Sequence, residues 1–177
     1  MGESSEIRIR SEIEADRNAV YTINAAAFPT AAEAKLVDRL RTNAQPVISL
    51  VAEDTTMKDE AVVGHILFSP VSLDSDPSLK IIGLAPMAVS PEQQRAGIGS
   101  ALVNAGLQRC RAAGFGAVVV LGHAEYYPKF GFASSELFGI KSEYDVPSDV
   151  FMILELVGDY LRTQTGTIRY HPEFSRL

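Results

Sequence analysis

The residue types at positions 94–100 are those of a site that binds an anion through the protein backbone. The sequence there is QRAGIGS, preceded by an apolar stretch of strand composition and followed by a helical pattern. A strand that leads into a glycine-rich helix start brings unpaired backbone N–H groups together with the positive end of a helix dipole. Such an arrangement suits phosphate. Gly97 and Gly99 leave room for a ligand to approach the backbone, and Gln94 and Arg95 stand where they can reach the same anion.

Two other phosphate-binding motifs do not fit this loop. A Rossmann dinucleotide site has a third glycine and an acidic residue about twenty positions further on. Here Leu102 takes the place of that glycine, and residues 118–120 are all valine. The sequence contains no GxxxxGK[ST] phosphate loop. A helix start with two glycines that only pack is the remaining alternative when the loop is considered alone.

The elements on either side of the loop must hold it beside a cleft. Residues 81–121 have the pattern strand, helix, strand, and the run AVVVL at 117–121 is typical of a buried parallel strand. The unit therefore predicts a right-handed crossover. Pro86 has no N–H group and cannot join a regular interior ladder. We expect either a simple local irregularity or a bulge that parts strand 80–89 from its parallel neighbour and leaves backbone groups unpaired.

The rest of the chain predicts further strands and helices in a single domain, residues 1–177. Polar residues 53–60 and 71–77 are expected to be turns between paired strands. A T-x-x-E capping box starts at Thr30. The further elements, in chain order, are strands at 7–10, 47–52, 61–68, 138–141, 151–157 and 167–170 and helices at 14–28, 30–43, 98–113 and 124–130.

Composition narrows the class of protein. The chain has 177 residues, of which 46% are apolar and 21% charged, with a net charge of −6. That charge argues against general nucleic-acid binding and slightly favours cationic substrates such as amines. No apolar run approaches the ~20 residues that span a bilayer, and the N-terminus lacks the pattern of a secretory signal. Cys110 is the only cysteine, which is compatible with a cytoplasmic location. A homodimer is possible, but the sequence does not specify it.

Three segments in chain order resemble the GNAT superfamily of acyl-CoA-dependent N-acetyltransferases. Residues 94–99, QRAGIG, look like its Q/R-x-x-G-x-G/A pyrophosphate loop. Met87, Ala88 and Val89 are similar to its central strand, and residues 127–132, YPKFGF, resemble its Y-x-x-x-G-F segment. The paired tyrosines after Gly122-His123 are similar to the YhbS-type subgroup. The resemblance implies an α/β (α+β) GNAT fold, with a mixed, mostly antiparallel sheet, a central splayed pair of parallel strands and flanking helices.

The resemblance also implies a co-substrate, acetyl-CoA, and a role for each motif. The pyrophosphate of CoA would be held by the residues of the loop, which are Gln94, Arg95, Ala96, Gly97, Ile98, Gly99 and Ser100. Between the parted strands, the pantetheine arm would bind the backbone of Met87, Ala88 and Val89 like an added strand. The Met87 amide would stabilise the oxyanion. Tyr127 would contact the cofactor as the general acid that protonates the CoA thiolate.

Other candidate groups have simpler interpretations. Tyr126 is expected to point elsewhere, as a packing residue or part of the substrate wall. Glu53 is the first candidate for the general base and Glu33 the second, although either carboxylate fits a solvated surface equally well. Cys110 lies on the apolar stripe of the helix after the loop, so we expect a buried structural thiol. The three histidines lack metal-ligand spacing, and no metal is expected.

The leading hypothesis is an acetyl-CoA-dependent N-acetyltransferase in which an amine attacks the bound thioester directly. A non-catalytic acyl-CoA-binding module that senses or regulates shares the same loop, but the retained Tyr127 favours the enzyme. A plain scaffold is the third alternative. The acceptor, a small-molecule or peptide amine, cannot be identified from residues 28–41 and 142–148, where this fold would place its contacts.

Overall fold

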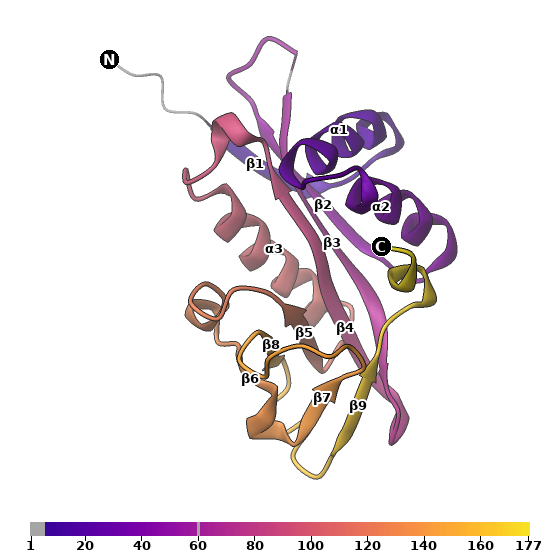
Figure 1. Ribbon diagram of the computed structural model, residues 1–177. Helices are drawn as coiled ribbons and strands as arrows, with labels where there is room; N and C mark the ends of the chain where they lie inside the picture. Colours follow the sequence, from indigo (N-terminus) through magenta and orange to yellow (C-terminus); the bar gives the residue numbers. More distant parts are fainter. Residues whose placement is uncertain (1–5, 60) are drawn as a thin grey trace.

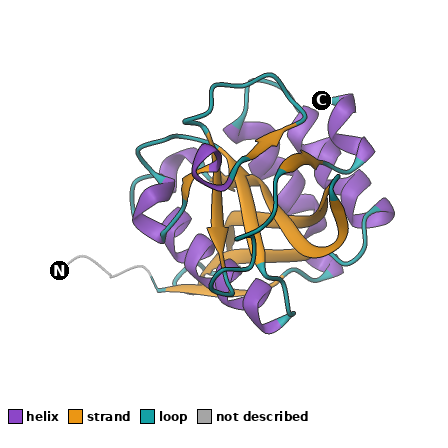
Figure 2. Cartoon of the chain, turned by 90° about the horizontal axis from the view of Figure 1, so that it is seen from below, coloured by secondary structure: helices purple, strands orange, loops and turns teal. Residues whose placement is uncertain are grey.

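A curved, mixed β-sheet forms the centre of the molecule, and helices cover both of its faces (Figures 1 and 2). The computed structural model describes residues 6–59 and 61–177, so part of the N-terminal segment considered above for a secretory signal lies outside the described residues. The strands are β1 (Ile7–Ser11), β2 (Ile48–Asp54), β3 (Ala61–Leu73), β4 (Asp76–Val89), β5 (Ala117–Leu121), β6 (Ala133–Ser134), β7 (Ile140–Ser142), β8 (Phe151–Glu155) and β9 (Gly166–Arg169). The helices are α1 (Arg17–Ala27), α2 (Ala32–Asn43) and α3 (Ile98–Ala112), with short 3-10 segments η1 (Glu14–Asp16), η2 (Pro91–Gln93), η3 (Tyr127–Phe130), η4 (Ser135–Phe138) and η5 (Pro172–Arg176).

The sheet is mostly antiparallel and has one parallel pair at its centre. The strand order is β1-β2-β3-β4-β5-β8-β6, and β9 pairs with both β3 and β7. Strands β4 and β5 run parallel, joined by the crossover through α3, whereas β1 to β4 form an antiparallel meander and β8 is antiparallel to β5. This arrangement confirms the fold class predicted from the sequence.

Apolar residues fill both interfaces between the sheet and the helices. On one face α3 packs through Ile98, Leu102 and Cys110 against β2 to β5. A Cβ atom on Gly106 would lie 2.3 Å from Cε2 of Phe68, so the small residue allows α3 to approach the sheet closely. On the other face α1 and α2 form a separate apolar cluster with β2, β3 and η5. Figure 1 shows this separation, with α3 on one side of the sheet and α1 and α2 on the other.

Three sequence expectations are corrected by the structure. The polar residues 71–77 are not all a turn, because β3 runs to Leu73 and β4 begins at Asp76; pairing with β9 continues β3 to this point. The capping box at Thr30 does not form: α2 begins at Ala32, and Thr30 Oγ1 accepts the Ala32 N–H at 3.2 Å. Of the helix expected at 124–130, only η3 is helical.

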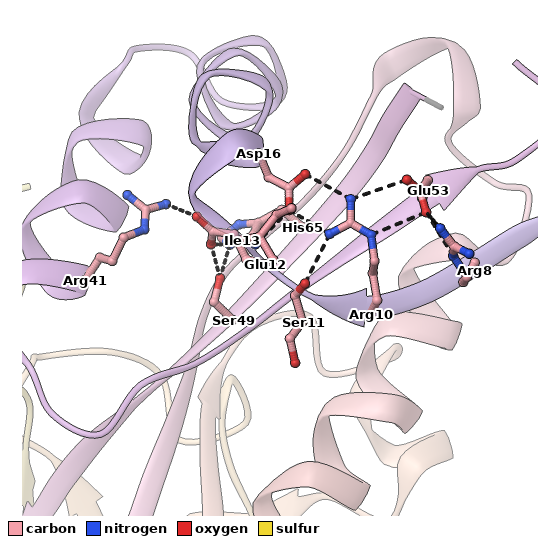
Figure 3. Close-up of polar contacts among 10 residues, drawn as sticks. All are labelled: Arg8, Arg10, Ser11, Glu12, Ile13, Asp16, Arg41, Ser49, Glu53 and His65. Atoms are coloured by element: carbon pink, nitrogen blue, oxygen red, sulfur yellow. Dashed lines mark hydrogen bonds and ion pairs between the residues drawn. The ribbon is translucent and has the colours of Figure 1, made fainter. Parts of the chain in front are cut away.

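A buried polar network ties the two helices to the sheet beside β1 (Figure 3). The Glu12 carboxylate accepts hydrogen bonds from Ser49 Oγ and Arg41 Nη2. Ser49 Oγ lies 2.8 Å from Nε2 of the fully buried His65, whose Nδ1 lies 3.1 Å from Asn24 Nδ2. The network therefore connects α1, α2, β2 and β3 through side chains that are largely excluded from water.

The hydrogen-bond directions determine the tautomer of His65. Asn24 Nδ2 donates to the Val20 carbonyl at 3.0 Å, and its second hydrogen points to Nδ1 of His65. Nδ1 is therefore an acceptor, and Nε2–H donates to Ser49, whose hydroxyl in turn donates to Glu12. Because the ring donates its only proton, Ser49 is not activated as a nucleophile. Burial lowers the pKa of His65 and the neutral ring completes the network.

The network predicts that stability falls as the pH decreases. Burial depresses the pKa of His65, and hydrogen bonds from His65 and Ser49 lower the pKa of Glu12 despite its burial. Both groups therefore bind protons more readily in the unfolded state, and protonation favours unfolding. We expect the free energy of unfolding, measured by urea titration, to fall first below pH about 6.5, where unfolded His65 titrates, and again below pH about 4.5.

The control for this prediction is His65→Gln, which removes the titrating group and keeps an amide able to hydrogen bond. This variant should lose less stability between pH 7 and pH 5 than the unaltered protein. An equal loss in both proteins over that interval would assign the effect to other groups.

Candidate active site

The central parallel strands separate where the sequence predicts a bulge. Strands β4 and β5 pair from Ile81 with Ala117 to Leu84 with Val120, and the described residues show no β5 partner for β4 beyond Leu84. On the other edge of β4, the pairing with β3 shifts its register. Ile66 pairs with Met87 and Phe68 pairs with Leu84, so β4 has one extra residue in this interval. This extra residue defines the bulge around Pro86. From residue 85 to 89, one edge of β4 is therefore open. The predicted splay is confirmed.

The loop after β4 presents backbone amides at the start of α3. Arg95 and Gly97 have φ angles of 67° and 82°, and the left-handed Gly97 is followed by the helical Ile98. Alternation of these conformations directs successive N–H groups into one concavity. The first hydrogen bond of the helix runs from Ala101 N–H to the Gly97 carbonyl, and no side chain of the described residues caps this end. The loop thus has the geometry of an anion site.

Gln94 behaves differently from the sequence expectation. Its Nε2 donates to the Val89 carbonyl at 3.1 Å, so in this structure the side chain supports the loop from the end of β4. The side chain of Arg95 is exposed. The Arg95 side chain makes no comparable hydrogen bond to the described backbone, so of these two residues it is the one that can bind an anion.

A cavity of about 830 Å³ starts at the open edge of β4. At one end it is lined by β4 residues 84–87, which include Met87, and by the segment after β5, with Gly122, His123, Tyr126 and Tyr127. The structure therefore brings together Met87 and Tyr127, as the sequence analysis expected. Ala88, Val89 and the loop residues 94–100 lie outside this cavity, along the same strand and at the start of α3.

The two neighbouring tyrosines both line this cavity, so Tyr126 does not point elsewhere as expected, although it does belong to the wall. Tyr127 is 7% exposed, and burial raises its pKa to about 12, so the phenol stays protonated at neutral pH. The Tyr126 hydroxyl lies 3.2 Å from Ser100 Oγ in the first turn of α3, and Lys129 Nζ lies 4.1 Å from the centre of its ring. The rings meet edge to face, with centroids 5.1 Å apart. Tyr126 therefore links the cavity to the anion-binding loop and forms part of the wall.

The structure does not support Glu53 as the general base. Glu53 is 1% exposed in β2, away from the cavity, and its Oε2 accepts from Arg8 at 2.6 Å (Figure 3). Hydrogen bonds from Arg10 and Arg8 lower the pKa of this carboxyl, so it is a poor proton acceptor. The sequence could not show this, because the pairing depends on the β1–β2 register. Glu33, the second candidate, does line the cavity.

The other reactive side chains match simpler roles. Cys110 is fully buried, and burial raises the pKa of its thiol to about 12, as expected for a structural residue. Within residues 6–59 and 61–177, no group of three or more His, Cys, Asp or Glu side chains could hold a metal ion. In the same ranges, no helix has the length and apolar character needed to cross a membrane.

Sequence reasoning placed part of the far wall of the cavity in residues 28–41 and 142–148 but missed its C-terminal residues, Tyr170 and Phe174. This wall is formed by Phe28 and Leu36 on one side and by Tyr144, Tyr170 and Phe174 from the last third of the chain. Residues 142–148 were expected near the acceptor, but no motif marks Tyr170 or Phe174. The only available signal was aromatic residues within an otherwise polar C-terminal stretch.

This combination of parted parallel strands, an uncapped glycine loop and a tyrosine beside the opening agrees with comparisons to known proteins. The profile described as "Acetyltransferase (GNAT) family" matches residues 17–132. The chain is 34% identical over 169 residues to the "Uncharacterized N-acetyltransferase YhbS" of Escherichia coli K12, covering 95% of this chain and 98% of that protein.

Two solved structures are also similar. The crystal structure of the GNAT family N-acetyltransferase YhbS from Escherichia coli in complex with CoA superimposes with a TM-score of 0.91 and 31% identity, covering 100% of this chain and 96% of the other. A GNAT family acetyltransferase from Brucella melitensis in complex with acetyl-CoA gives a TM-score of 0.77 and 32% identity, covering 96% and 99%.

The fold and the site define an acyltransferase. The chain belongs to the GNAT acetyltransferase family, and its similarity to the YhbS protein extends over nearly its full length.

The position of Tyr127 depends on Gly122, which gives a first test of the site. A Cβ atom at Gly122 would lie 2.3 Å from Cε2 and 2.9 Å from Cδ2 of Tyr127. Gly122→Ala should therefore displace the ring and reduce the free energy of unfolding by about 1–3 kcal/mol, as overpacking does. Urea denaturation followed by tyrosine fluorescence measures the change.

The matched control is Gly158→Ala, because an added Cβ there meets nothing within 4 Å. That variant should unfold like the unaltered protein. Equal stability of the two variants would contradict the close packing of Tyr127 on Gly122.

Proposed function

We propose that the protein transfers an acetyl group from acetyl-CoA to a primary amine by direct attack in a ternary complex. The observation that carries this proposal is the cavity that joins Met87 and Tyr127 at the open edge of β4. A pantetheine arm pairing with that edge would lead the thioester from the loop at the start of α3 to this cavity. CoA and acetyl-CoA in the two similar crystal structures support the same co-substrate.

The pyrophosphate of CoA is assigned to the backbone of residues 95–100 and the side chain of Arg95. Gly97 is left-handed and no side chain of residues 6–59 or 61–177 caps this end, so the first N–H groups of α3 are left for the ligand. Tyr126, hydrogen bonded to Ser100, fixes the wall between this loop and the thioester. Gln94 supports the loop through Val89 and supplies no direct charge.

The reaction assigns the oxyanion to Met87 and the proton to Tyr127. The amine lone pair forms a C–N bond to the thioester carbonyl carbon, and the oxygen becomes an anion that the Met87 amide stabilises. As the C–S bond breaks, Tyr127 donates its proton to the leaving sulfur. The nitrogen then loses one proton, which restores Tyr127 directly or through water. Amide and CoA thiol are the products, so no acyl-enzyme forms.

Replacing Arg95 tests the pyrophosphate assignment. Arg95→Asn removes the cation but keeps a residue that tolerates a positive φ. Loss of a charge-assisted hydrogen bond should weaken acetyl-CoA binding about tenfold in isothermal titration calorimetry. Pantetheine, which has no pyrophosphate, provides the comparison: its affinity should not change. An equal loss for both ligands would indicate that the loop itself had rearranged.

Replacing Tyr127 tests the general acid. Tyr127→Phe keeps the ring packing and removes the ionisable hydroxyl, so kcat should fall by about 10²-fold or more while the Kd for acetyl-CoA stays nearly constant. CoA thiol release, followed with a thiol reagent and a panel of primary amines, gives the rate. An unchanged kcat across pH would contradict the assignment.

A further inference from the structure

The far part of the cavity has aromatic and aliphatic walls that the thioester does not need. The Tyr144 and Tyr170 rings lie with centroids 5.5 Å apart, and those of Tyr170 and Phe174 lie 5.3 Å apart. Phe28 and Leu36 line the same cavity from the end of α1 and from α2. Since the anion-binding loop lies at the opposite side of Met87, these walls remain for the acceptor. They favour an apolar body.

One charged side chain interrupts these walls. Glu33 is the only aspartate, glutamate, lysine or arginine among the described residues that line the cavity. Its carboxylate is not used to cap α2, because the capping box does not form. Its Oε2 is buried without a hydrogen-bond partner. A buried acceptor without a donor is costly, and a cationic N–H group from a ligand would satisfy it.

A second polar atom on the same walls also has no partner. The Tyr170 hydroxyl is buried and makes no hydrogen bond to the described residues, although its ring packs in an aromatic cluster. Burial raises the pKa of this phenol, so it stays neutral. The wall therefore offers one acidic side chain, one neutral phenol without a partner among the described residues, and several ring faces. Ring faces attract cations and pack on other rings.

Resting on the proposed function, we propose that the acceptor is a primary amine with a single cationic nitrogen and an apolar, preferably aromatic, body. Glu33 pairs with the ammonium group and sets specificity, while Tyr144, Tyr170 and Phe174 pack against the body. Before the attack on the thioester, the ammonium group gives one proton to water, so that the nitrogen has its lone pair. Polyamines and amino sugars carry more cations than the described lining of this cavity has acidic side chains, and acidic acceptors would face Glu33 without a basic side chain. Glu33 is thus a binding residue that selects the substrate.

The test measures binding directly, so that it does not depend on turnover. The full chain, saturated with CoA, is titrated calorimetrically with 2-phenylethylamine, with 2-phenylethanol, which has the same body and no charge, and with ethanolamine and spermidine. Phenylethylamine should bind tightest. Glu33→Gln should weaken phenylethylamine binding about tenfold or more, as loss of a charged hydrogen bond does, and leave 2-phenylethanol binding unchanged.

Two controls separate this role from a structural one. Glu136→Gln changes an exposed carboxylate outside the cavity and should bind all four ligands like the unaltered protein. The thermal midpoint of Glu33→Gln should not decrease, because the carboxylate oxygen it removes has no hydrogen-bond partner in the described part of the chain. Tyr144→Ala should weaken phenylethylamine binding several-fold more than ethanolamine binding.

The outcomes distinguish this inference from the proposed function. Phenylethylamine binding that is insensitive to Glu33→Gln, tighter binding of ethanolamine or spermidine, or no amine binding at all would overturn the inference. Parallel assays of thiol release from acetyl-CoA address the function. Glu33-dependent amine binding without thiol release would support the acceptor site and contradict the transferase. Thiol release with amines whose binding does not depend on Glu33 would support the transferase and contradict the acceptor site.

Discussion

The separation of β4 from β5 after Leu84 is the constraint on which the site depends. A regular ladder would use the backbone groups of residues 85–89 within the sheet and would close the cavity beside Met87. Pro86 prevents that ladder, because it has no N–H group and sits in a bulge that β3 accommodates with an extra residue on β4. The proposed co-substrate binding therefore uses backbone at the edge of β4 that has no β5 partner among the described residues.

The rest of the molecule holds this opening in place from both faces. On the face that α3 covers, the close packing of Gly106 on Phe68 brings this helix near β3. The start of the helix then lies beside β4. On the other face, the chain of hydrogen bonds from Asn24 through His65 to Glu12 anchors α1 and α2, which carry Phe28 and Glu33. These hydrogen bonds join both helices to the same two strands, β2 and β3.

Residue patterns predicted the glycine loop, the opening beside it and much of the fold. Proline in a strand, glycines at a helix start and a β-branched run each have a local cause, so β4, the loop, α3 and β5 could be placed from sequence. The extent of β3, the partners of β9 and the pairing of Glu53 with Arg8 could not, since they follow from register between distant segments. Glu33 stood among the candidates, but only the failure of its capping box explained its free oxygen.

Part of the cavity wall lies outside the segment that the family profile matches. The family profile ends at residue 132, whereas Tyr144, Tyr170 and Phe174 lie beyond it. In the proposed function, backbone geometry binds the donor, and side chains from α1, α2 and the last third of the chain contact the acceptor. Evolution can therefore exchange one wall for another without disturbing the cofactor cleft, and a designer who wishes to redirect this enzyme has the same freedom in the same few positions.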